Sequence, residues 1–207
     1  GLVTMHMGSG QGKLDPLFYA LEHADVPAKN FLPTHMLRTP ELIEEGVKLV
    51  RMGGYMDCTA GCTDADMEAD AEKIFDILNR DGVTADHVTL SSDAFGSQPR
   101  FDAAGECIGL TYASPEFLHK TIKSLVRRGL ALEEALKLLT STPAELLAKT
   151  GVKGCVAVGA DADLLVLDEE LDITTLFAKG ETAVLNGELI MKGRFELFAI
   201  FTHWYHL

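Results

Sequence analysis

The chain has 207 residues, a hydrophobic share of 47% and a formal net charge of −13. The hydrophobic share is enough for a sizeable core, and the length suits one domain or one and a fraction. The acidic balance argues against nucleic acid and against an anionic membrane surface, because both attract clustered Lys and Arg. No apolar run approaches the roughly 20 residues of a membrane-spanning helix, so we expect a soluble, cytoplasmic protein.

Alternating strand-like and helix-like segments fill the first two-thirds of the chain. Short apolar runs predict strands at 1–5, 30–34, 55–59 and 87–92. Helices are predicted from Asp15, as N-cap before Pro16, and at 39–52, 66–80, 115–128, 131–139 and 143–150. Such alternation with short loops indicates an α/β fold with a parallel sheet. Four strand–helix units are too few to close an eight-stranded barrel, so we expect half of a (β/α)8 barrel, with an open doubly wound sheet as the alternative.

The sequence pattern changes near Lys153. Short β-runs at 154–168 and 182–192 are punctuated by turn residues, and Asn186-Gly187 is a hairpin signal. We therefore expect part of a small β-domain over 153–196. The segment 197–207 holds the only Trp, and its composition matches nothing before it, so we treat it as an atypical tail.

Three polar residues, His6, His35 and Asp93, each follow a strand-like run. The carboxyl ends of parallel strands face the active site, and the intervals of 29 and 58 residues fit one and then two strand–helix units. Imidazole and carboxylate suit Zn²⁺, although a catalytic site needs at least one more ligand or a bridging base. Because the chain begins inside a strand-like segment, we expect further ligands upstream of Gly1. The alternative is that all three residues simply hydrogen-bond to loops.

Other candidate residues lie close to these three. Arg38, three positions after His35, could hold a substrate carboxylate with a bidentate fork, or be an ordinary surface arginine. Ser97 and Gln98 could donate hydrogen bonds to a substrate, or serve as turn residues. The segment GSGQGK at 8–13 fails the P-loop pattern, because a Leu follows its Lys, and indicates a loop at the mouth of a site.

The remaining charged and sulfur-bearing segments point to no metal site. The cysteines Cys58, Cys62, Cys107 and Cys155 are too sparse for a disulfide scaffold and lack the spacing of a zinc ribbon, so we expect four free thiols. The acidic run at 64–72 lacks the glycine of a calcium loop, and we interpret it as the start of a helix.

Four segments together resemble the isoaspartyl (β-aspartyl) dipeptidases of the amidohydrolase superfamily, over nearly the whole chain to about Glu196. They read GLVTMHMGSG, FLPTHMLR, VTLSSDAFGSQPRFD and GADADLLVLD. The resemblance implies the C-terminal half of a TIM-type barrel at 1–152, with strands five to eight, and part of a small β-sandwich at 153–196. It implies a hydrolase that cleaves isoaspartyl dipeptides through a zinc-activated hydroxide, with a homo-oligomer as its full-length form.

The resemblance also implies roles for individual residues around two Zn²⁺ ions. His6 and His35 would be the ligands from strands five and six. Asp93 would be the ligand from strand eight and the catalytic proton shuttle, while Arg38 and Ser97 would hold the carboxylate end of the substrate.

The family's metal site also needs groups that this chain does not contain. The family carries a His-x-His pair, which this chain lacks, and a bridging carboxylated Lys on a strand that would precede Gly1. We therefore expect the chain alone to be inactive. The alternatives are another amidohydrolase, dihydroorotase-like or an N-acyl amino acid deacylase, or a non-catalytic metal-binding remnant. Mn²⁺, Co²⁺ or Fe²⁺ would suit the same ligands.

Overall fold

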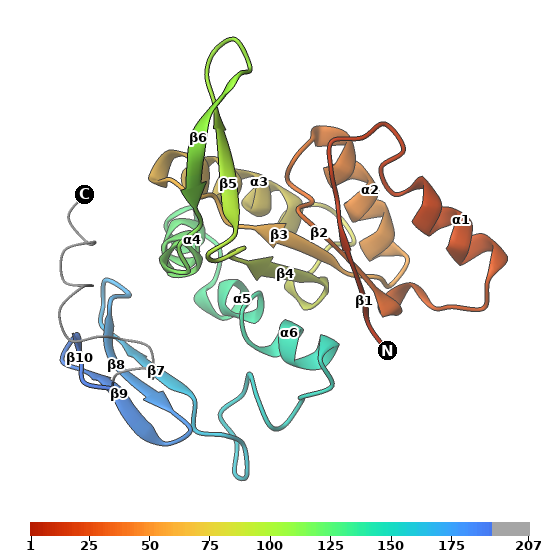
Figure 1. Ribbon diagram of the computed structural model, residues 1–207. Helices are drawn as coiled ribbons and strands as arrows, with labels where there is room; N and C mark the ends of the chain where they lie inside the picture. The colour runs from red at the N-terminus through yellow and green to blue at the C-terminus, as the bar shows by residue number, and fades with distance from the viewer. Residues whose placement is uncertain (192–207) are drawn as a thin grey trace. The chain divides into compact units, whose positions relative to one another are not determined.

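The computed structural model describes residues 1–191, which fall into two compact units (Figure 1). The first unit runs from Gly1 to Thr150, and the second begins at Gly151. The segment 197–207 lies outside the described residues. Within the described chain, we find no helix of the length and apolar character that crossing a membrane requires.

Two pairs of parallel strands form the centre of the first unit. Strand β1 (Val3–His6) pairs with β2 (Phe31–Thr34), and β3 (Met56–Thr59) pairs with β4 (Val88–Ser91). All four predicted strands are confirmed, with ends shifted by up to two residues. The expected single sheet is not formed, because no backbone ladder joins β2 to β3 in the described chain.

Helices follow the strands in the predicted order. They are α1 (Asp15–His23), α2 (Pro40–Arg51), α3 (Asp64–Leu78), α4 (Glu116–Arg127), α5 (Leu132–Lys137) and α6 (Ser141–Leu146), with 3₁₀ turns at Ala28–Asn30 and Ala85–His87. Asp15 was predicted as the N-cap of α1 but is its first residue, and Leu14 takes the cap position. Helix α6 ends before the predicted residue 150, because Ala148 adopts a left-handed φ of 53° and the amide of Lys149 bonds back to the carbonyl of Ala144.

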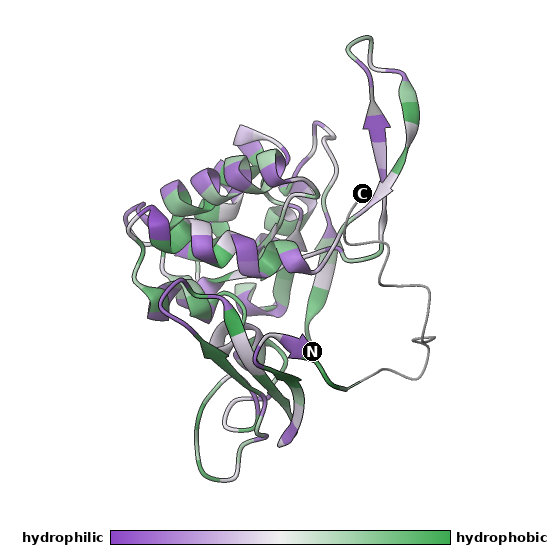
Figure 2. Ribbon diagram, turned by 90° about the vertical axis from the view of Figure 1, so that its left-hand side faces the viewer, coloured by the Kyte–Doolittle hydropathy of each residue, from purple (hydrophilic) through white to green (hydrophobic). Residues whose placement is uncertain are grey.

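The helices of the first unit are amphipathic, and their apolar sides form the core. The helices visible in Figure 2 carry both hydrophilic and hydrophobic residues. Leu42 and Leu49 of α2, Ile74 of α3 and Leu125 of α4 are fully buried in one hydrophobic cluster that also includes Met56 of β3. Threonine hydroxyls cap α2 and α3, where each accepts a hydrogen bond from the backbone amide three positions on. Two aspartates lie in the first turn of α3, so the acidic run at 64–72 is a helix start, as expected.

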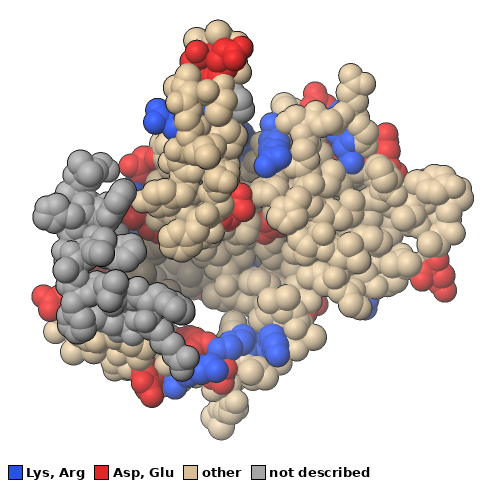
Figure 3. All heavy atoms as spheres, in the orientation of Figure 1, with Lys and Arg blue, Asp and Glu red and all other residues tan. Residues whose placement is uncertain are grey.

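A β-hairpin that the sequence pattern did not predict follows β4. Strands β5 (Ser97–Phe101) and β6 (Cys107–Tyr112) pair antiparallel and project away from the strand pairs (Figure 1). Leu110 and Tyr112 are exposed, and the tip carries acidic residues, seen in red at the top of Figure 3. The alternative of a turn at Ser97 and Gln98 is therefore wrong, because both residues pair with β6.

The described part of the second unit is a four-stranded antiparallel sheet. Its strands are β7 (Leu164–Leu167), β8 (Ile173–Ala178), β9 (Glu181–Leu185) and β10 (Glu188–Leu189), in the spatial order β10-β9-β8-β7. The Asn186-Gly187 hairpin is confirmed, and both residues have positive φ, 52° and 79°, as a two-residue hairpin turn requires. Strand β8 was not predicted.

Candidate active site

The side chains of His6 and His35 meet at the carboxyl ends of β1 and β2. His6 is the last residue of β1, and His35 follows the last residue of β2. The parallel pairing of these strands places His6 opposite Thr34, so the two imidazoles lie side by side. Nδ1 of His6 is 3.1 Å from Nε2 of His35.

The second ring nitrogen of His35 also has a partner. Its Nδ1 lies 2.9 Å from the hydroxyl oxygen of Thr59, at the end of β3. An Nδ1–H donating to Thr59 leaves a lone pair on Nε2, which faces His6. Burial lowers the pKa of His35 below its ordinary value of 6.5, and the nearby charge of Arg38 lowers it further. The neutral imidazole that a metal ligand requires is therefore favoured.

Two of the three predicted ligands have a strained backbone. His35 has a φ of 65° and Asp93 a φ of 48°, both in the left-handed region that residues with a Cβ rarely occupy. Each cost is on the order of 1–3 kcal/mol and persists only where the surroundings impose it, which happens most often at functional sites. The strain therefore supports a functional reading of both positions independently of their residue types.

Asp93 lies in a tight turn between β4 and β5. Its Oδ2 accepts a hydrogen bond of 2.7 Å from Nε2 of Gln98, and its carbonyl accepts one from the amide of Gly96. The side-chain amide of Gln98, a candidate donor to substrate, donates to Asp93 instead. These bonds fix where the Asp93 carboxylate points.

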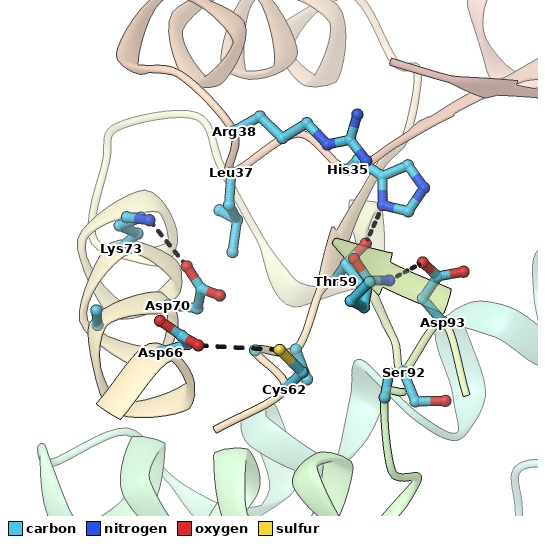
Figure 4. Close-up of a pocket in the computed structure, with 15 residues that line it drawn as sticks. His35, Leu37, Arg38, Thr59, Cys62, Asp66, Asp70, Lys73, Ser92 and Asp93 are labelled. Carbon is cyan, nitrogen blue, oxygen red and sulfur yellow. Dashed lines mark hydrogen bonds and ion pairs between the residues drawn. The ribbon is translucent and has the colours of Figure 1, made fainter. Parts of the chain in front are cut away.

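A cavity of about 330 Å³ lies beside these residues (Figure 4). His35, Arg38 and Asp93 all line it, so the structure brings together three of the five predicted site residues. His6 reaches the site through its contact with His35, whereas Ser97 is exposed on β5 and does not line the cavity. Arg38 is exposed, as a side chain that meets a substrate from solvent must be.

Helix α3 supplies a polar wall that sequence reasoning missed. Asp66, Asp70 and Lys73 line the cavity from this helix, on the side away from His35 in Figure 4. Lys73 pairs with Asp70 at 2.8 Å, and burial raises the pKa of the Asp70 carboxyl above its ordinary value. The spacing of these residues along α3 signals a shared helix face, but only the fold shows that this face lines the same cavity as His35 and Asp93.

The described residues do not form a complete metal centre. Among residues 1–191, no group of three or more His, Cys, Asp or Glu side chains comes close enough to hold an ion. Nδ1 of His6 and Nε2 of His35 lie 3.1 Å apart, and Asp93 lies on the same side of the cavity as His35, opposite the α3 residues in Figure 4. All four cysteines are free, as expected.

Comparison with known proteins identifies the family. The chain matches the model of the amidohydrolase family over residues 20–189. It belongs to the amidohydrolase family. Such enzymes are generally metal-dependent hydrolases, and the mixed α/β architecture of this chain matches that of solved amidohydrolase barrels.

The chain is similar to beta-aspartyl dipeptidases among solved amidohydrolases. One is the enzyme of the thermophilic, keratin-degrading Fervidobacterium islandicum AW-1 in complex with β-Asp-Leu, with 34% identity and a TM-score of 0.77 over 95% of this chain. A second structure of a beta-aspartyl dipeptidase from that organism has 30% identity and a TM-score of 0.73 over 95% of this chain. An amidohydrolase from Thermotoga maritima MSB8, at 20% identity, a TM-score of 0.57 and 89% coverage, shares the fold. The chain spans 50%, 48% and 43% of these three proteins, about half their length.

Proposed function

We propose that this chain provides half of the active site of a metal-dependent hydrolase that cleaves isoaspartyl dipeptides. In this proposal the first unit is the C-terminal half of the barrel, with β1 to β4 as barrel strands five to eight. The second unit is part of a small β-sandwich. The observation that carries the proposal is the pair of imidazoles His6 and His35 at adjacent strand ends, beside a cavity that Arg38 and Asp93 also line.

The ring nitrogens of His6 and His35 fit a shared zinc ion. Two nitrogens bound to one tetrahedral Zn²⁺ at about 2.0–2.1 Å lie about 3.3 Å from each other. The observed separation of 3.1 Å between Nδ1 of His6 and Nε2 of His35 is close to this value, and parallel pairing of β1 with β2 holds both residues at neighbouring strand ends. His6 would bind through Nδ1 and His35 through Nε2, because Thr59 occupies the other nitrogen of His35.

The residues of this chain would divide the chemistry as follows. A bound zinc ion would lower the pKa of a coordinated water, so that this water loses a proton readily near neutral pH. Asp93 takes the proton from the attacking water and returns it to the leaving amine, acting first as general base and then as general acid. Gln98 holds the carboxylate of Asp93 in place. Arg38 binds the carboxylate end of the dipeptide with a bidentate fork.

The chain alone should bind a metal ion weakly and hydrolyse nothing. Its described residues bring together only His6 and His35, whereas the proposed centre holds two zinc ions and needs a His-x-His pair and a bridging Lys. Hydrolysis of β-Asp-Leu by the purified 207-residue chain, at a rate like that of the Fervidobacterium enzyme, would contradict this part of the proposal.

A chimera tests the reaction itself. Residues 1–196 of this chain would replace the matching half of the Fervidobacterium islandicum enzyme, which supplies the other half of the barrel. The expected result is zinc-dependent hydrolysis of β-Asp-Leu, little hydrolysis of α-Asp-Leu, dihydroorotate or N-acyl amino acids, and loss of activity in Asp93→Ala. A folded, zinc-loaded chimera that cleaves only one of the other substrates would overturn the assignment.

A further inference from the structure

Asp57, in the middle of β3, is a buried carboxylate surrounded by hydroxyl groups. Its relative exposure is 4%. Its Oδ1 accepts a hydrogen bond from Thr89 at 2.6 Å, and its Oδ2 accepts two, from Thr34 at 2.5 Å and from Ser91 at 2.6 Å. A charge this deeply buried is costly unless hydrogen bonds compensate it, and here three hydroxyls do so.

One of these three hydrogen bonds, from Thr34, crosses the gap between the β1–β2 pair and the β3–β4 pair. No backbone ladder connects β2 to β3 in the described chain. The bonds that do connect them are Thr34 to Asp57, the amide of Met36 to the Asp57 carbonyl at 3.2 Å, and His35 to Thr59. The first two end on Asp57. The Oδ2 atom thus accepts one hydrogen bond from Thr34 of β2 and one from Ser91 of β4.

The residues that Asp57 connects are neighbours of the proposed ligands. Thr34 directly precedes His35, and Ser91 lies two positions before Asp93. A shift of β2 against β3 would carry His6 and His35 away from Asp93, because the paired imidazoles lie on one strand pair and the carboxylate on the other. Metal sites lose affinity when the groups that position their ligands are removed.

We propose that Asp57 is a positioning residue that fixes the β1–β2 pair against the β3–β4 pair and thereby sets the place of His35 relative to Asp93. This inference rests on the proposed function for its consequence, since the ligands are those of the proposed metal site. Its structural part stands on the hydrogen bonds alone. Burial raises the pKa of the Asp57 carboxyl, while the three hydroxyls lower it, which is the balance expected of a buried acceptor.

Two threonines give a matched pair of variants. Thr34→Val and Thr89→Val each remove one hydroxyl from the same carboxylate without changing the shape of the side chain, and both positions are buried, at 6% and 4% exposure. Thr34 bonds across the gap, whereas Thr89 bonds within the β3–β4 ladder, which backbone hydrogen bonds already hold. If Asp57 has a purely structural role, the two variants should have equal effects. If Asp57 is a positioning residue, only Thr34→Val should loosen the contact between the strand pairs and weaken the metal site.

Hydrogen exchange at the Met36 amide measures whether the contact between the two strand pairs is intact, and it needs no metal, because this amide donates to the Asp57 carbonyl. In Thr34→Val, we expect its protection, relative to the slowest amides of the same variant, to fall about tenfold or more, and to stay within about twofold in Thr89→Val. Co²⁺ titration followed by visible absorption then measures the metal affinity of the site. Thr34→Val should lower Co²⁺ affinity about tenfold, and Thr89→Val should leave it near wild type.

The two readouts separate the two hypotheses. Equal Met36 protection in both variants would overturn the positioning role of Asp57. A second outcome is that wild-type protein binds no Co²⁺ while Met36 still loses protection only in Thr34→Val. This result would overturn the proposed metal site and would still support Asp57 as the residue that fixes the two strand pairs. Asp57→Asn adds a conservative rescue, because its carbonyl oxygen can still accept from Thr34 and Ser91; it should keep Met36 protected, whereas Asp57→Val should not.

Discussion

Nδ1 of His6 lies 3.1 Å from Nε2 of His35, although the two residues are 29 positions apart in the chain. Parallel pairing of β1 with β2 brings them together, and His35 adopts a left-handed φ of 65° directly after β2. An exposed imidazole on one strand end thereby meets a buried one on the next. This is how two ordinary strand ends form a pair of nitrogens that can share a metal ion.

Removing either imidazole should weaken metal binding. We expect His6→Ala and His35→Gln each to lower Zn²⁺ affinity about tenfold or more, because a single remaining imidazole no longer chelates the ion. Isothermal titration of the purified chain measures the change. His23→Ala is the matched control, since His23 is exposed on α1, where its ring bonds to the carbonyl of Tyr19 and stacks on the Tyr19 ring. Equal affinity losses in all three variants would show that zinc binds elsewhere.

Gly96 should be essential for the position of Asp93. A Cβ at Gly96 would lie 2.9 Å from the Asp93 carbonyl oxygen and 3.2 Å from its Oδ1, too close for the turn to stay in place. We expect Gly96→Ala to cost about 1–3 kcal/mol of folding free energy and to lower Co²⁺ affinity about fivefold or more. Gly10→Ala is the control, because a Cβ there meets nothing within 4 Å. Urea unfolding and Co²⁺ titration measure both effects, and identical results for the two variants would contradict this role of Gly96.

Local pattern predicts the residues at the strand ends but not the contacts between them. The apolar runs before His6, His35 and Asp93 were enough to place all three at the carboxyl ends of parallel strands. The local sequence does not single out Thr59 and Asp57, because their importance depends on which strands become neighbours, and this is a property of the fold. Asp57 lies inside the predicted strand at 55–59, and its side chain accepts three hydrogen bonds from residues of the two neighbouring strands.

The β5–β6 hairpin was missed for a related reason. Pro99 and Gly109 lie within its two strands, and both residue types weaken the signal of a strand. Pro and Gly are tolerated here because the two strands form an exposed antiparallel ribbon. Its first strand then carries Gln98, which fixes the carboxylate of Asp93.

The four thiols should react in the order of their exposure. Cys107 and Cys155 are exposed, Cys62 is partly buried, and Cys58 is fully buried in the core. Burial raises the pKa of Cys58 well above its ordinary value of 9.0 and that of Cys62 to a smaller extent, which lowers the thiolate fraction that reacts. A thiol-specific reagent at pH 8 should therefore modify two cysteines quickly, a third slowly and the fourth only on unfolding. Rapid modification of Cys58 in the native protein, located by mass spectrometry, would contradict the buried position of β3.

Glu68 should stabilise the contact between α3 and α4 in a pH-dependent way. Its carboxylate accepts a hydrogen bond of 2.7 Å from Ser124 and forms ion pairs with Arg127 and Arg128. The Ser124 hydroxyl, followed by the charge of Arg127, holds the pKa of Glu68 below its ordinary value of 4.5. A carboxyl with a lowered pKa in the folded state stabilises the protein above that ordinary value, and the contribution is lost as the pH falls through the folded pKa.

Glu68→Gln should therefore be less stable than wild type at pH 7 and nearly equal to it in acid. Because the Glu68 side chain is 41% exposed, solvent screens its ion pairs, and we expect a loss of only about 0.5–1 kcal/mol at pH 7. Urea unfolding at pH 7 and at about pH 3 measures the difference. Glu44→Gln is the matched control: Glu44 pairs with Arg80 but is 66% exposed, so its replacement should change stability by less than about 0.3 kcal/mol. A Glu68→Gln loss that persists undiminished in acid would assign the effect to packing between α3 and α4, because a charge interaction must vanish once the wild-type carboxyl is protonated.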